Sequence, residues 1–583
     1  LGVTDLYLSP VLAAAPGSTH GYDVVDHRRI SPVMGGFEGL QDLAEAAHEA
    51  GMGVVVDIVP NHMAVPTPGW FNLPLWSFLR DGPDSPYADW FDVPRNEPVL
   101  MPVLARRIGS VLADEELTLT RMVVPTEPGR GKQWVLRYHD HAFPVAPGTE
   151  SLPLHVLVDR QHYRLAYWKV GDKETNYRRF FDVGTLAAIR VEHPEVFAGT
   201  HGLIRILVQE GVVDALRVDH PDGLADPRGY LTHLSQATDG AWVVAEKILA
   251  PDESLPDDWP VAGTTGYDAA WRIDQLQVDP AGAAQLGALM QEVAGDAPAD
   301  YPRVVEQAKR EVIDGSLSAE VDRLARILGQ LTQADVRLRD HTLRDLRDCV
   351  VELLVAADRY RAYVVPGTPP WPDAMVTSPT HDTKRGEDVR ARLNVLASYP
   401  TEWSDLVHRL RALTAAQRPV DLDGRTENLL WQTLWGTWAP ASADPMTPRR
   451  LSAYLVKAAR EQKIWTTWAE PASAREEALS AYATHLLTDP EVARQMDAFA
   501  SLTARALAKV MRLASRFWQL EQLYESNAKY GPTWSPRYMC FMDATQFVQV
   551  ALAAGVLEGF VPVPRWWSLR NTPVSTDLTG EDY

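Results

Sequence analysis

The chain has 583 residues and a mass of 64.8 kDa, which exceeds one ordinary domain but fits one large α/β barrel with insertions. Its 46% hydrophobic and 23% charged residues are ordinary for a globular protein and exclude a disordered or fibrous chain. The formal net charge of -21 argues against a polyanionic partner such as nucleic acid.

The first 62 residues alternate between strand and helix patterns. Residues 1–10 are apolar and predict a strand with a loop after it, and residues 38–50 predict an amphipathic helix that ends at Gly51. Residues 53–60, GVVVDIVP, predict a second buried strand. Strand, helix and strand in this order are typical of a right-handed βαβ unit and indicate a parallel sheet.

Residues 63–200 break this rhythm. They are rich in proline, aromatic and turn residues, with short alternating runs such as 133–138, and we expect a large insertion here. Regular order returns with a helix that ends near Glu210, a strand at 215–219, a further helix and a strand at 242–246. The alternation of strand and helix therefore resumes after the insertion.

The second half of the chain is mainly helical. Residues 270–362 keep apolar residues at helical spacing and predict a second, helical insertion. Residues 373–382 return to strand-like character, and helical patterns dominate from 385 to about 500.

Polar residues follow the predicted strands. Asn61 and His62 follow one strand, while Asp219 and Glu246 each end another. In a parallel barrel these carboxyl ends meet on the active-site face. Retaining cleavage of a glycosidic bond needs two carboxyl groups roughly 5 to 5.5 Å apart, and Asp382 in TSPTHDTKR is a third candidate. One acid at a strand end is more often a helix cap or a loop salt bridge, but three acids flanked by His and Arg favour a catalytic site.

Five short motifs resemble the conserved regions of the α-amylase superfamily, glycoside hydrolase family 13. They occur in the superfamily's order and read HGYDV, DIVPNH, RVDH, EKI and THD. Longer stretches are similar to those of the maltooligosyltrehalose synthase family within it: NYRRFFDV, RVDHPDGLADP, EKILAPDESLPDDWPVAGTTGYD and THDTKRGEDVRARL. The resemblance extends from the start of the chain to about residue 500.

The resemblance implies roles for the three acids. Asp219 would be the nucleophile, Glu246 the general acid and base, and Asp382 the carboxylate that stabilises the transition state through sugar hydroxyls. Arg217 would keep Asp219 ionised by charge pairing. The residues expected to bind or surround the substrate are His20, Tyr22, Asn61, His62, Arg217, His220, Lys247, Tyr267, His381, Lys384 and Arg385.

The fold that the resemblance implies is α/β, a TIM (β/α)8 barrel with a large insertion after strand 3 and a helical insertion. Leu1 falls just before the second barrel strand, and the family's eighth-strand pattern is not recognisable after Ser501. We therefore expect a barrel that is incomplete at both ends of this chain. The expected parts are barrel strands 2–3 (1–62), the insertion domain (63–200), strands 4–6 (201–269), the helical insertion (270–370), strand 7 with the following helices (371–500) and a divergent C-terminal segment of unknown structure (501–583).

The activity that the resemblance implies is an intramolecular transglycosylation. The reducing-end α-1,4 linkage of a maltooligosaccharide would become an α,α-1,1 linkage through a covalent glycosyl-enzyme, a step of trehalose biosynthesis. Two alternatives stay open: an α-1,4-glucan hydrolase or transglycosylase of the same superfamily, and a catalytically inactive carbohydrate-binding barrel. The sequence has no phosphate-binding loop and no clustered metal ligands, so we expect no cofactor and no metal. Calcium stays open as an alternative, with Asn61 and nearby acids as oxygen ligands. The implied functional partner is a maltooligosyltrehalose trehalohydrolase.

The cysteine content bears on the compartment. Cys349 and Cys540 are far apart and lack metal-ligand spacing, which favours a reducing compartment over a disulfide-bonded secreted protein. The longest apolar stretch, near 550–557, is much shorter than the roughly 20 residues of a membrane span. We expect a cytoplasmic protein that binds neither nucleic acid nor membranes. The opening with Leu1 in place of Met indicates a fragment, so a missing targeting signal carries little weight.

Overall fold

The computed structural model describes residues 4–94, 97–250, 253–276, 278–294, 301–357, 360–361, 385–438 and 446–503. The chain divides into two compact units. The first comprises Leu1–Asp268 and Asp300–Thr377, and the second comprises Ala269–Ala299 and Ser378–Tyr583.

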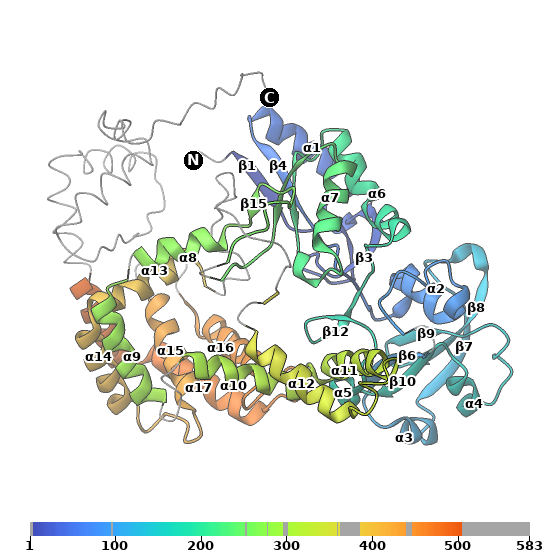
Figure 1. The fold of residues 1–583 in the computed structure, drawn as a ribbon. Coiled ribbons are helices and arrows are strands. Elements are labelled where there is room, and N and C mark those ends of the chain that lie inside the picture. The colour runs from blue at the N-terminus through green and yellow to red at the C-terminus, as the bar shows by residue number, and fades with distance from the viewer. Residues whose placement is uncertain are drawn as a thin grey trace. The chain divides into compact units, whose positions relative to one another are not determined.

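A parallel five-stranded sheet organises the first unit (Figure 1). Its strands, in spatial order, are β1 (Asp5–Leu8), β4 (Gly53–Ile58), β13 (Ala215–Val218), β14 (Trp242–Ala245) and β15 (Gly263–Thr264). Every neighbouring pair is parallel. The apolar run of β4 is buried from Val54 onward, as a strand covered on both faces of a parallel sheet requires.

Helices α1 (Gly36–Glu49), α6 (Pro194–Gln209) and α7 (Pro227–Ala237) alternate with these strands along the chain and lie beside the sheet (Figure 1). The buried residues of α1 recur at helical spacing, so one face of the helix packs inward. The predicted alternation of strand and helix is confirmed, and with it the α/β class. In the part of the chain that the structure describes the sheet is open rather than closed, and the strand expected at 373–382 lies outside that part.

Smaller sheets make up the rest of the strand structure. They are the antiparallel pair β2 (Leu12–Ala14) and β3 (Val24–Ile30), the sheet of β11 (Arg179–Phe180), β12 (Val183–Ala188) and β5 (His62–Ala64), the antiparallel sheet of β7 (Leu117–Val123), β8 (Lys132–Tyr138) and β9 (His141–Pro144), and the parallel pair β6 (Val99–Leu104) and β10 (Tyr163–Tyr167). The helices among them are α2 (Leu73–Asp81), α3 (Ile108–Ala113), α4 (Leu154–Asp159) and α5 (Gly171–Glu174). β5 follows β4 closely and pairs with β12, so Ala188 lies opposite His62. This pairing brings the end of the irregular segment back to the main sheet, at the carboxyl end of β4.

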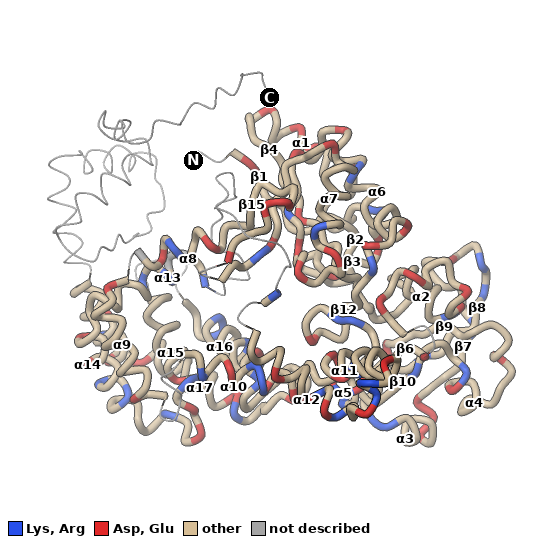
Figure 2. The backbone as a smooth tube through the Cα atoms, viewed as in Figure 1, with Lys and Arg blue, Asp and Glu red and all other residues tan. Residues whose placement is uncertain are grey.

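Three helices from the middle of the chain complete the first unit. They are α10 (Tyr301–Asp314), α11 (Ser318–Gln333) and α12 (Leu343–Ala356). Thr342 caps α12, since its side chain accepts from the backbone of Asp345 while the Asp345 carboxylate accepts from the backbone of Thr342. Basic residues are interspersed with acidic ones along these helices (Figure 2), and Arg310 pairs with both Glu306 and Glu352.

The second unit is helical in its described residues. Its helices are α9 (Pro280–Ala294), α13 (Glu387–Val395), α14 (Pro400–Leu413), α15 (Gly424–Gly436), α16 (Pro448–Gln462) and α17 (Ser473–Thr488), and α8 (Tyr267–Leu276) runs across the boundary between the units. Trp431 is 1% exposed and packs in a core with Trp435, Leu430 and Tyr482. Among the described helices of either unit, none is both long enough and apolar enough to cross a membrane.

Candidate active site

Two of the three predicted acids lie side by side at one edge of the main sheet. Asp219 follows β13 directly, and Glu246 follows β14 directly. β13 and β14 are parallel, with Val218 opposite Ala245, so the residues after them leave the sheet at the same edge. The position of these acids at strand ends, predicted from the sequence, is confirmed.

One guanidinium links three carboxylates at this edge. Arg217 Nη1 lies 2.7 Å from Asp57 Oδ2 and 2.8 Å from Asp219 Oδ1, and Nη2 lies 3.1 Å from Glu246 Oε1. The Arg217 side chain is 1% exposed, that of Asp219 8% and that of Glu246 18%. One guanidinium therefore holds Asp219 and Glu246 next to each other at the ends of neighbouring strands.

Burial and neighbouring acids act on Asp219 in addition to the expected charge pairing with Arg217. Arg217 does pair with Asp219, but burial raises the pKa of this carboxyl well above its ordinary range, and nearby Asp57 and Glu246 raise it further. Arg217 lowers the pKa without cancelling these effects, because three acids share its one charge. The charge pairing of Arg217 with Asp219 expected from the sequence is present, and the ionised state of Asp219 stays a prediction.

The two oxygens of Asp219 differ in their contacts. Oδ1 accepts from Arg217, whereas Oδ2 is buried and has no hydrogen-bond partner among the described residues. An anchored carboxylate with one unengaged oxygen is suited to attack an electrophilic carbon. Glu246 is held differently, because its Oε2 accepts a hydrogen bond from the backbone N–H of His220 at 2.8 Å.

Asp57 is a site residue that the sequence analysis quoted within a motif but gave no role. Its Oδ2 accepts from the hydroxyls of Tyr7 and Tyr22 at 2.7 Å each, besides Arg217. Burial raises the pKa of Asp57, against the lowering effect of Arg217 and the two hydroxyls. The signal for it was a charged residue inside the otherwise apolar run GVVVDIVP.

The predicted histidines occupy different surroundings. His62 and His220 are held mainly neutral near neutral pH, because burial lowers the pKa of His62 to about 3 and that of His220 to about 4. The Phe180 ring lies between them, 4.7 Å from the His62 centroid and 5.0 Å from that of His220. His20 is 53% exposed, and its Nδ1 accepts from the backbone N–H of Tyr22 at 3.1 Å.

Asn61 is buried and engaged on both sides. Its Nδ2 lies 3.3 Å from His62 Nδ1, and its Oδ1 accepts from Arg178 Nη1 at 2.7 Å. The guanidinium makes this oxygen a poor ligand for a cation. Among the described residues, no three histidine, cysteine or acidic side chains are grouped so that they could hold a metal ion.

Lys247 is buried between two acids. Its side chain is 1% exposed, and its ammonium lies 3.0 Å from Asp222 Oδ2 and 3.0 Å from Glu253 Oε1. A buried lysine that is paired with two carboxylates supports the loop around it. The contact of Lys247 with the substrate stays a prediction.

Of the remaining predicted residues, the structure describes Tyr267 and Arg385. Tyr267 begins α8, three residues after β15, at the same edge of the sheet. Arg385 belongs to the second unit and donates to Gln432 Oε1 at 3.3 Å. His381, Asp382 and Lys384 lie outside the described residues.

Tyr360 and Arg361 are neighbours of the site that the sequence analysis missed. Arg361 Nη1 donates to the backbone carbonyls of Asp222 at 2.6 Å and Leu224 at 2.5 Å, and the Tyr360 ring lies 6.0 Å from that of His220. They follow α12, far along the chain from the loop they contact. A tyrosine and an arginine after a helix carry no signal that would predict this contact.

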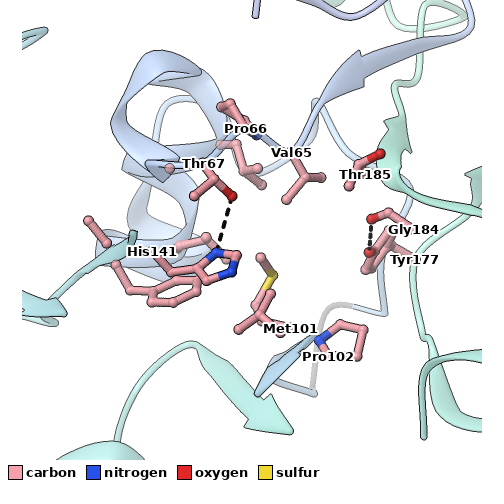
Figure 3. Close-up of a pocket in the computed structure, with 15 residues that line it drawn as sticks. Val65, Pro66, Thr67, Met101, Pro102, His141, Tyr177, Gly184 and Thr185 are labelled. Carbon is pink, nitrogen blue, oxygen red and sulfur yellow. Dashed lines mark hydrogen bonds between the residues drawn. The ribbon is translucent and has the colours of Figure 1, made fainter. Parts of the chain in front are cut away.

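A separate cavity lies within the first unit (Figure 3). Its volume is about 170 Å³, and its lining is mostly apolar, with Met101, Pro102 and Val65 among the residues. Two hydrogen bonds cross its wall, between Thr67 Oγ1 and His141 Nδ1 at 3.1 Å and from the Tyr177 hydroxyl to the Gly184 carbonyl at 2.7 Å. None of the catalytic candidates lines it, so it is distinct from the carboxylate site.

Comparison with known proteins places this geometry in a family. The alpha amylase catalytic domain family matches residues 1–239. A putative maltooligosyl trehalose synthase of Mycobacterium tuberculosis is 33% identical over 606 residues, which cover 87% of this chain and 74% of that protein. The chain belongs to the maltooligosyltrehalose synthase family.

Solved structures agree with this assignment. Maltooligosyltrehalose synthase from Arthrobacter ramosus is 35% identical, with a TM-score of 0.73, and the match covers 86% of this chain and 74% of that one. A glycosyltrehalose synthase, DSM5389, is 29% identical with a TM-score of 0.70 over 86% of this chain and 75% of that one.

The C-terminal part has different relatives. Residues 478–541 match the phosphatidylglycerol lysyltransferase C-terminal family. The lysylphosphatidylglycerol biosynthesis bifunctional protein LysX of Rhodococcus jostii is 47% identical over 62 residues, 11% of this chain and 6% of that protein. This similarity accounts for the segment RFWQLEQLYESNAKYGPTWSPRYMC, which has no counterpart in the α-amylase pattern.

Proposed function

We propose that the chain converts the reducing-end α-1,4 linkage of a maltooligosaccharide into an α,α-1,1 linkage within the same molecule, giving a maltooligosyltrehalose. The observation that carries the proposal is the contact of one Arg217 guanidinium with both Asp219 and Glu246 in a chain of this family. That arrangement provides a nucleophile and a proton donor on one substrate bond.

The first half of the reaction breaks the terminal linkage. Glu246 donates a proton to the oxygen of the terminal glucose while Asp219 Oδ2 attacks the anomeric carbon of the neighbouring glucose, and the C–O bond between the two sugars breaks. The glycosyl chain becomes an ester of Asp219, and free glucose is the leaving group. Asp57 and Arg217 keep Asp219 Oδ1 in place during the attack.

The second half re-forms a bond to the same glucose. The glucose turns in the site and presents its own anomeric hydroxyl to Glu246, which now takes the proton as a base. The oxygen of that hydroxyl attacks the glycosyl ester and releases Asp219. Water must be kept out at this stage, because hydrolysis of the ester competes with transfer.

The roles of the surrounding residues are part of the proposal. Tyr22 and His62 line the subsite at which the bond breaks, and Asp382 stabilises the transition state through sugar hydroxyls. His20, Asn61, His220, Tyr267, His381, Lys384 and Arg385 complete the substrate site. The proposed frame is a (β/α)8 barrel, interrupted by the insertion at 63–200 and the helical insertion at 270–370, with the divergent segment at 501–583.

The proposed setting is the cytoplasm, where Cys349 stays a free thiol. A trehalohydrolase that acts on maltooligosyltrehalose is the proposed functional partner, because the product still carries a maltooligosyl chain.

The experiment is incubation of the purified chain with maltopentaose, following reducing ends and oligosaccharide mass together. Loss of reducing ends at constant mass, abolished by Asp219→Ala, supports the isomerase. Shorter or longer products favour the hydrolase or transglycosylase. Maltopentaose binding without any product, unchanged by Asp219→Ala, favours the inactive barrel.

A further inference from the structure

Arg178, in the motif NYRRFFDV, lies between the carboxylate site and helix α11. We propose that Arg178 is a positioning residue: it holds the loop that orients Glu246 and is itself held by an ion pair with Asp92, which Arg323 of α11 anchors. The inference rests on the proposed function for the role of Glu246.

Arg178 connects four separate parts of the first unit. Its Nη1 donates to Asn61 Oδ1 at 2.7 Å and to the Gly223 carbonyl, its Nη2 donates to the Ile189 carbonyl at 3.1 Å, and its Nε donates to Asp92 Oδ2 at 3.0 Å. A guanidinium can serve these directions at once because its five N–H groups lie in one rigid plane. An ammonium cannot.

The loop that Arg178 holds is short and tightly packed. It begins at His220, whose backbone is left-handed (φ 44°) and whose N–H donates to Glu246 Oε2 at 2.8 Å. Gly223 closes the turn, since its N–H donates to the His220 carbonyl at 3.0 Å. A Cβ on Gly223 would lie 2.4 Å from the His220 ring and 2.5 Å from Asn61 Oδ1. The Arg178 bond to the Gly223 carbonyl therefore fixes one end of a turn whose other end fixes Glu246.

The ion pair between Arg178 and Asp92 extends to Arg323 of α11. Asp92 Oδ1 accepts from Arg323 Nη2 at 2.6 Å, so Asp92 lies between two arginines. The Arg323 and Asp92 side chains are 28% and 27% exposed. Among the described residues Arg323 pairs with Asp92 and not with the carboxylates of the site, so an effect on Glu246 must pass through Asp92 and Arg178.

The chain offers a matched control for Arg323. Arg347 of α12 pairs with Asp322, the residue before Arg323 on α11, at 2.7 Å, and is also 28% exposed. Arg323→Gln and Arg347→Gln each remove an ion pair of α11, and Arg347→Gln also removes a 4.0 Å contact with Asp314 of α10. Only Arg323→Gln affects the chain of hydrogen bonds that leads to the loop. Their difference separates positioning of Glu246 from general stability of the helix.

The experiment measures kcat, KM and thermal midpoint for Arg178→Lys, Arg323→Gln and Arg347→Gln with maltopentaose. We expect Arg178→Lys to lower kcat about 10- to 100-fold with KM within about 3-fold, because small misplacement of a catalytic group costs rate more than binding. Arg323→Gln should lower kcat about 2- to 5-fold, and Arg347→Gln should leave it unchanged at a similar loss of thermal midpoint.

A folded Arg178→Lys variant with the wild-type kcat overturns the proposal. If that variant does not fold, equal kcat for Arg323→Gln and Arg347→Gln overturns it, and a lower kcat for Arg323→Gln alone supports it. The assay measures two quantities: the total rate at which glycosidic bonds are broken, and the linkage in the product. If the wild type gives a hydrolysis product, the proposed function is contradicted. The rate of bond breakage still compares the action of Glu246 among the variants, so this inference remains testable.

Discussion

Replacing Arg217 with lysine tests the electrostatic design of the site. Lysine keeps one positive charge but cannot reach Asp57, Asp219 and Glu246 together, since its ammonium is a single point on a flexible stem. Two charge-assisted hydrogen bonds are lost at about 1.5–3 kcal/mol each. We expect a destabilisation of about 3–5 kcal/mol, in the range for breaking a buried ion pair.

The same substitution should change the pH dependence of activity. Arg217 is the group that lowers the pKa of Asp219, against burial and the two neighbouring acids that raise it. Weakening that contact raises the pKa of Asp219 further, so the ionised nucleophile forms at higher pH. The acidic limb of kcat/KM against pH should therefore move to higher pH.

The assay is a pH profile of kcat/KM together with a thermal melt. Arg228→Lys is the control, because Arg228 lies in the same unit, is 59% exposed and pairs at the surface with Asp258. The control should match the wild type in both measurements. An Arg217→Lys variant with a wild-type acidic limb and melting point would refute the reasoning.

Three further substitutions test other parts of the structure. His27 is buried, neither ring nitrogen has a hydrogen-bond partner among the described residues, and burial lowers its pKa to about 4. The folded chain thus binds fewer protons than the unfolded chain between about pH 4 and 6.5, so the free energy of unfolding falls as the pH drops through that window. We compare the free energy of unfolding in urea at pH 7 and pH 4.5. His27→Leu should make the loss between these two pH values about 2–3 kcal/mol smaller than in the wild type. Lys247→Met leaves Asp222 and Glu253 without the Lys247 ammonium and should cost about 3–5 kcal/mol in urea unfolding. A raised KM at unchanged stability would instead favour direct contact with the substrate. Trp431→Ala opens a cavity in the helical unit and should cost about 3–5 kcal/mol in its thermal or urea transition, a loss below about 1 kcal/mol being inconsistent with the packing described.

The sequence predicted the parts of the fold that follow from local periodicity. The runs at 53–60 and 215–219 are mostly apolar, with an acid within or at the end of each, and they became β4 and β13 of the parallel sheet. Asp219 and Glu246 were found because parallel strands end on one edge.

Features that depend on tertiary contacts were not predictable in this way. Lys247 is next to Glu246 in the chain, and this adjacency suggested a contact with the substrate, but it could not predict the burial of Lys247 between Asp222 and Glu253. Tyr360 and Arg361 reach the loop after β13 from more than 130 residues away, which periodicity cannot detect.

The electrostatics of Asp219 also depend on the folded site. The pairing of Arg217 with Asp219 is visible in the spacing RVD, but the water removed from around the carboxyl and the two neighbouring acids are properties of the folded site. The contacts of Asp57 likewise exist only in the folded chain, because its partners Tyr7 and Tyr22 come from separate segments.

The most direct test of intramolecular transfer uses maltopentaose labelled with ¹³C at C1 of its reducing-end glucose. The account predicts that the labelled carbon passes from the hemiacetal signals to a single acetal signal of an α,α-1,1 linkage, in an oligosaccharide of unchanged mass. Addition of unlabelled glucose should not dilute the label in the product, because the leaving glucose stays in the site. Label that accumulates in free glucose, or in products of other lengths, would contradict the account.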